Sequence, residues 1–189
     1  MLMLLAALLL PAHDGSALAA TDVAHMAALY EEACLKTFPI DTELDALMAR
    51  KGATPLTADE LRISLGADPG RGWTVSDGDQ TFTVLLELPP YHACSVRALR
   101  PNSGKLDLAH YDAVVETFVA SHRGFVSQPA KDADRGGIHM HAQIQHRPLP
   151  AGGGELLMAI DQQVTDVDKL AAGTTATPLR FVHQITTRN

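Results

Sequence analysis

Residues 21–66 carry apolar side chains at the spacing of three or four that one face of an α-helix requires. Three short segments share this pattern, and each ends at proline or glycine: Val23–Pro39, Asp41–Gly52 and Thr57–Gly66. Asp41 is a suitable N-cap for the second segment, and Thr57 with Glu60 matches a capping box at the start of the third. The pattern predicts an N-terminal layer of three helices.

After residue 70 the apolar residues alternate with polar ones or form short runs, as they do in β-strands. The predicted strands are Trp73–Val75, Thr81–Leu88, Tyr91–Leu99, Gly137–His146, Glu155–Asp161 and Leu179–Thr186. A longer helical stripe runs from Asp107 to His122, and its apolar residues Leu108, Tyr111, Val115 and Phe118 are expected to face the sheet. The segment Ala130–Gly136 is polar and is expected to be a loop.

Most connections in the second half have the length of hairpin turns, which favours antiparallel pairing. We therefore predict an α+β fold. Its antiparallel sheet would have about five to six strands, covered by the N-terminal helical layer and by one longer central helix. Nothing divides residues 21–189, so they are expected to form one domain.

The first twenty residues have the composition of a secretory signal peptide. Leu2–Leu10 is an uncharged apolar run, Pro11 breaks it, and Ala17 and Ala19 are small residues before an expected cleavage after Ala19 or Ala20. The run is too short to span a bilayer. This pattern predicts a periplasmic or secreted protein with no stable membrane anchor.

Charge excludes two classes of partner. The chain has 15 Lys and Arg against 22 Asp and Glu, a net charge of −7. No basic stripe is available to release counterions from nucleic acid or to hold anionic lipid. An unknown protein partner in the cell envelope is expected instead, because an acidic surface attracts a basic partner.

The chain contains two cysteines, Cys34 and Cys94. In an oxidising compartment an isolated pair most simply forms a disulfide. His92 lies two residues before Cys94, which leaves open a reactive or metal-bound thiol.

The clearest candidates for chemistry are His139 and His141. On a strand they share one face with Gln143 and Gln145, while Ile138 and its alternate neighbours take the other face. Two imidazoles on one strand face can converge on zinc or copper, although no further ligand can be named beyond guesses such as His146 or His183. A polar, water-facing side of the sheet is the alternative, and we expect only weak metal binding. No cofactor is expected.

No catalytic residues can be assigned from the sequence. Gly152–Gly154 and the Gly70-Arg71-Gly72 segment lack the spacing of phosphate-binding loops, and the serines lack a nucleophile elbow. His183 lies among Leu179, Phe181 and Ile185 and is expected to be a hydrogen-bonded core residue.

Three segments in the first half resemble a known family: Cys34–Pro39, Asp68–Trp73 and Pro89–Val96. They resemble an uncharacterised family of small exported proteins and lipoproteins of Neisseria and related proteobacteria. The resemblance implies a periplasmic setting and a domain with paired cysteines, and it implies no activity. The chain differs from the lipoprotein members because no cysteine ends the leader.

These observations favour a periplasmic, non-enzymatic binding or interaction protein, such as an inhibitor or an immunity-type protein that masks its partner. Two alternatives stay open. One is a metal-handling protein that uses His139 and His141, and the other is a hydrolase with an unfamiliar site.

Overall fold

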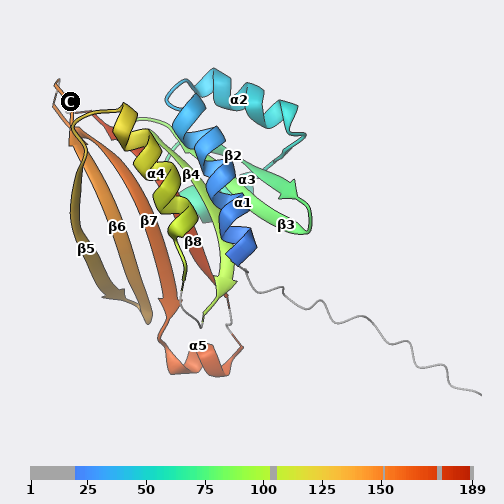
Figure 1. The fold of residues 1–189 in the computed structure, drawn as a ribbon. Helices are drawn as coiled ribbons and strands as arrows, with labels where there is room; N and C mark the ends of the chain where they lie inside the picture. The colour runs from blue at the N-terminus through green and yellow to red at the C-terminus, as the bar shows by residue number, and fades with distance from the viewer. Residues whose placement is uncertain (1–19, 103–105, 151, 174–175, 188–189) are drawn as a thin grey trace, which may run out of the picture.

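The computed structural model describes residues 20–102, 106–150, 152–173 and 176–187, so the predicted signal peptide lies outside the described residues. The helices are α1 (Ala20–Tyr30), the π-helix η1 (Glu31–Thr37), α2 (Asp41–Arg50), α3 (Ala58–Leu65), α4 (Ala109–Ser121) and α5 (Val167–Ala171). The strands are β1 (Thr54–Pro55), β2 (Gly70–Asp77), β3 (Gln80–Glu87), β4 (Ala93–Pro101), β5 (Val126–Arg135), β6 (Ile138–Pro148), β7 (Gly154–Val164) and β8 (Ala176–Thr186). Figure 1 shows how these elements are arranged.

All eight strands belong to one antiparallel sheet with the order β1-β2-β3-β4-β8-β7-β6-β5. The chain builds one half of the sheet from β1 to β4 and crosses over through α4. It then returns from the far edge, β5, until β8 pairs with β4 in the middle. This crossover places α4 over the centre of the sheet, next to α1 (Figure 1).

The hydrophobic core lies between the helices α1, η1, α2 and α4 and one face of the sheet. Tyr30 of α1 and Tyr111 of α4 both contact Phe181 of β8, with ring centroids 5.8 and 4.5 Å apart. Tyr111 and Val115 are buried as expected, whereas Leu108 and Phe118 are partly buried against the core. The stripe on α4 therefore faces the sheet.

Cys34 and Cys94 form the predicted disulfide, with Cα atoms 5.3 Å apart. It joins η1 to β4, so the helical layer is covalently attached to the middle of the sheet. Among the described residues, no helix is long and apolar enough to cross a membrane.

The predicted fold class is wrong in its strand count and in its central helix. The sheet has eight strands rather than five to six, because β5 occupies most of the expected loop Ala130–Gly136 and the short β1 pairs with β2. Nearly every residue of β5 is exposed, so the strand carries no alternation of apolar residues for a sequence pattern to detect. Helix α4 has 13 residues against 11 in α1, so no single long helix dominates the layer.

Candidate functional site

A groove lies between α4 and strands β5 to β7, on the helix-covered side of the sheet. In antiparallel pairs, directly opposed residues project to the same face. Leu157 of the buried core is paired with Gln145 of β6, and Gln145 is paired with Ser127 of β5. The helix-covered face therefore continues past α4 as a polar surface on β6 and β5, strands that extend beyond the helix in Figure 1.

This groove has a volume of about 300 Å³. Its apolar floor is formed by Leu157 together with Tyr111 and Val115 of α4. Carboxamide and hydroxyl groups lie on the strand side: Ser127, Gln143 and Gln145. A groove of this size, with an apolar floor and a few polar groups around it, is typical of a small binding site.

Two carboxylates of α4, Asp112 and Glu116, line the groove one helical turn apart. Like charges at this spacing repel one another. Burial, followed by the charges of Glu116 and Asp107, raises the pKa of Asp112 above its ordinary value. Within the described part of the chain, neither Asp112 nor Glu116 forms an ion pair. The groove therefore presents excess negative charge beside neutral hydrogen-bonding groups.

The structure brings His139 and His141 together with two carboxylates. His141 is paired with Asp132 of β5, and His139 is paired with Asp134. Asp132 Oδ1 lies 2.8 Å from His141 Nδ1 and 3.5 Å from His139 Nε2, and Asp134 Oδ1 lies 2.9 Å from His139 Nδ1. These two histidines lie on the helix-covered face, since His141 is also paired with Asp161 of β7.

Hydrogen bonds shift two pKa values in this cluster. The bond to Asp134 raises the pKa of His139 more than burial lowers it, and the charges of Asp134 and Asp132 raise it further. The bond from His141 lowers the pKa of Asp132. Among the described residues, no group of three or more His, Cys, Asp or Glu is arranged to hold a metal ion. In this geometry the imidazoles are partners of carboxylates.

Sequence reasoning missed Asp132 and Asp134 because their segment is predicted as a loop. The signal was available in Gly136-Gly137, a two-residue hairpin turn in which both glycines have positive φ. A hairpin at this turn pairs Arg135 with Ile138 and so places both Asp–His pairs in register.

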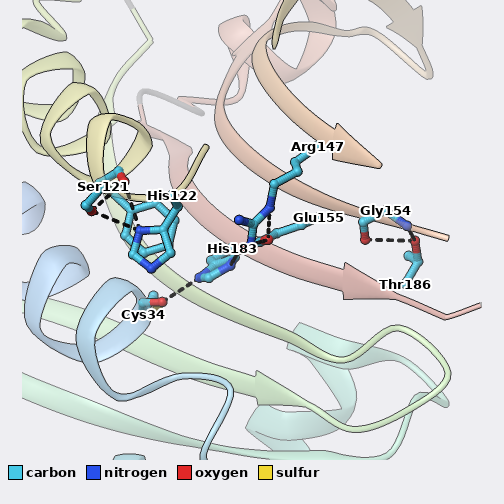
Figure 2. Close-up of polar contacts among 9 residues, drawn as sticks. Cys34, Ser121, His122, Arg147, Gly154, Glu155, His183 and Thr186 are labelled. Carbon is cyan, nitrogen blue, oxygen red and sulfur yellow. Dashed lines mark hydrogen bonds and ion pairs between the residues drawn. The ribbon is translucent and has the colours of Figure 1, made fainter. Parts of the chain in front are cut away.

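A second polar cluster is buried beneath the helical layer (Figure 2). His183 and Glu155 are 2% and 3% exposed, and His183 Nε2 lies 2.7 Å from Glu155 Oε1. Arg147 Nε donates to Glu155 Oε2 over 2.8 Å, and Arg147 Nη2 contacts the same oxygen. On its other side, His183 Nδ1 lies 2.6 Å from the carbonyl oxygen of Cys34. His183 is thus the hydrogen-bonded core residue that the sequence predicts.

This cluster stabilises the fold by connecting the helical layer to three strands. When both ring nitrogens of His183 carry hydrogens, each has an acceptor, one on η1 and one on β7. Burial raises the pKa of Glu155, but hydrogen bonds from His183 and Arg147 outweigh burial and leave that pKa below its ordinary value. The network therefore holds the helical layer, β6, β7 and β8 together through hydrogen bonds.

Ser121 and His122 lie nearby at the end of α4, with Ser121 Oγ 3.0 Å from His122 Nδ1 (Figure 2). Both groups also contact the carbonyl oxygen of Phe118, and the His122 ring stacks on the Phe118 ring at 3.9 Å. These contacts close the last turn of the helix and give the serine no geometry of an activated nucleophile.

No protein-family model, curated protein or solved structure matches this chain. The resemblance to exported proteins of Neisseria and related proteobacteria therefore stays a prediction.

Proposed function

We propose that the protein is a non-enzymatic binding protein of the cell envelope that takes a basic segment of a partner protein into the groove between α4 and β5–β7. The observation that carries the proposal is the pair Asp112 and Glu116, two like charges that line the groove without an ion-pair partner among the described residues. A lysine or arginine side chain placed between them would remove their repulsion.

The strand side of the groove supports a peptide as the ligand. Gln143, Gln145 and Ser127 carry both donors and acceptors, and these can pair with the amide groups on either side of a basic residue. The apolar floor at Leu157 fits the methylene part of a lysine or arginine side chain. A volume of about 300 Å³ suits one such side chain with its adjoining peptide groups.

The proposed location rests on the leader-like N-terminus and on the disulfide. A structural disulfide is rare in cytosolic proteins and common in exported ones. The bond between Cys34 and Cys94 therefore supports an oxidising compartment such as the periplasm.

The experiment is an NMR titration of the isotope-labelled protein with three capped tripeptides: alanyl-lysyl-alanine, alanyl-arginyl-alanine and alanyl-glutamyl-alanine. We expect the two basic peptides to shift the signals of Gln143, Gln145 and Ser127, and the acidic peptide to leave them unchanged. The double variant Asp112→Asn with Glu116→Gln should bind the basic peptides at least ten-fold more weakly, a loss of about 1.4 kcal/mol.

The matched control is Glu43→Gln with Asp168→Asn, two exposed positions away from the groove that change the net charge equally. This control should bind like the unmodified protein. Equal binding of the acidic peptide, or equal loss of binding in the control, would contradict the proposal. Affinity capture from an envelope extract, with the groove variant as the comparison bait, would then identify the partner.

A further inference from the structure

The opposite face of the sheet carries two arginines placed directly beside one another. Arg97 of β4 is the cross-strand partner of Arg180 of β8, so both side chains project to the face that α1 and α4 leave uncovered. Like charges directly opposite on neighbouring strands destabilise a sheet. In a chain of net charge −7, this pairing concentrates positive charge on one face of the sheet.

The two guanidinium groups are only partly satisfied by the protein. The Nε atoms of Arg97 and Arg180 are both buried without a hydrogen-bond partner in the described part of the chain. Arg97 donates through Nη1 to the carbonyl oxygen of Ser64, and its Nη2 lies 4.0 Å from Glu87. Burial and then the charge of Arg180 lower the pKa of Arg97 to about 10, against the opposing effect of Glu87. The carboxylate of Glu87 therefore faces two cations, Arg97 and Arg180.

Arg97 also lines an open groove of about 710 Å³ between α3 and strands β3, β4 and β8. Apolar side chains extend into solvent around it: Ile63 is 80% exposed and Leu99 is 65% exposed. Pro178 of β8 completes the apolar lining. Thr81 and Thr83 add hydroxyl groups, and Asp79 in the β2–β3 turn is the carboxylate among the lining residues.

Arg180 is the cross-strand neighbour of Arg97 and is not itself one of the lining residues. We propose that this groove binds an amphiphilic organic anion, with its carboxylate or phosphate held by Arg97 next to the charge of Arg180, and its apolar part against Ile63, Leu99 and Pro178. A guanidinium presents a planar set of donors that matches a carboxylate or phosphate, and the neighbouring charge of Arg180 adds to the attraction. The anion offsets the repulsion between the two arginines. This site lies on the opposite face from the acidic groove and does not depend on the function proposed for that groove.

Isothermal titration calorimetry with four probes tests the site: octanoate, octyl phosphate, inorganic phosphate and octanol. We expect saturable binding of octanoate and octyl phosphate, at least ten-fold weaker binding of inorganic phosphate, and no measurable binding of octanol. The relative affinity of octanoate and octyl phosphate identifies the preferred head group. Octanol binding as tightly as octanoate would show an unspecific apolar surface and overturn the proposal.

The decisive variant is Arg180→Gln, which should weaken octanoate binding at least ten-fold while the melting temperature stays the same or rises, because a repulsive neighbour is removed. Arg97→Gln should abolish binding as well, but its bond to Ser64 gives it a structural role, so Arg180→Gln carries the test. Arg123→Gln, an exposed position outside the groove, is the matched control and should bind normally. Unchanged octanoate affinity in Arg180→Gln would exclude the proposed site.

Discussion

At the scale of single residues, charged groups in this protein are placed in two different ways. Arg147, Glu155 and His183 satisfy one another inside the molecule, and they belong to the stability of the fold. Asp112 and Arg180, by contrast, lie beside groups of the same charge. Because such repulsion costs stability, the second arrangement is the basis of the two ligand sites that we propose.

The buried carboxylate makes stability depend on acid pH. The pKa of Glu155 is lower in the folded protein than its usual value of 4.5, so its contribution is complete above that value and is lost as the pH falls through the folded pKa. We expect urea unfolding to show a free energy that falls on acidification below about pH 4.5. Glu155→Gln should reduce stability at pH 7 by about 3 kcal/mol, since it removes the buried carboxylate that is bonded to Arg147 and His183.

The Glu155→Gln variant should also show a smaller fall in the free energy of unfolding on acidification. The exposed substitution Glu43→Gln is the control and should leave this fall unchanged. If the free energy of unfolding of Glu155→Gln falls on acidification as much as that of the unmodified protein, other carboxylates cause the effect and the prediction is wrong.

His139 and His141 are expected to bind metal weakly, because among the described residues no group of three or more His, Cys, Asp or Glu is arranged to hold a metal ion. A true structural zinc site would add several kcal/mol of folding free energy. Calorimetry with zinc should therefore show micromolar or weaker binding, and the melting temperature should be nearly the same with and without chelator. A stoichiometric nanomolar isotherm that His139→Ala abolishes would instead support the metal-handling alternative.

At the scale of elements, the sequence predicts best where apolar side chains repeat. Thr57 and Glu60 form the expected capping box of α3, with Glu60 N 3.3 Å from Thr57 Oγ1. The stripe on α4 is likewise visible, because Tyr111 and Val115 are spaced for one helical face. The capping box identifies the start of α3, and the apolar repeat identifies the buried face of α4.

Strand β5 has no apolar repeat by which a sequence pattern could identify it. It is exposed along almost its whole length, and its register shifts between Gln128 and Lys131, next to Pro129. Proline and a bulge protect an edge strand from pairing with another chain, but they also remove the alternation that identifies a strand. The candidate groove was hidden for the same reason, since one of its walls is β5. Both the strand and the site follow from tertiary pairing that periodicity does not encode.

At the scale of the whole molecule, the order of strands explains how distant segments meet. β8 is last in the chain, yet it pairs with β4 in the middle of the sheet. The sheet is therefore complete only when the C-terminal strand is in place, and α4 must cross the sheet before β5 begins. This crossing leaves β5 and β6 beyond the helical layer, where the acidic groove forms, while Arg97 and Arg180 project to the opposite face.

The disulfide adds a covalent link between the helical layer and the middle of the sheet. It joins residues 60 positions apart and fixes η1 to β4, next to the strand that is added last. On the chain-entropy model, a loop of this length contributes about 4 kcal/mol to the free energy of unfolding. The double variant Cys34→Ala with Cys94→Ala should therefore lose about 4 kcal/mol in denaturant unfolding, with its Cα trace unchanged. The intact mass of the unmodified protein should rise on reduction by the mass of two hydrogen atoms. Two free thiols in protein recovered from an oxidising compartment, or a variant as stable as the parent, would contradict this account of how the helical layer is held on the sheet.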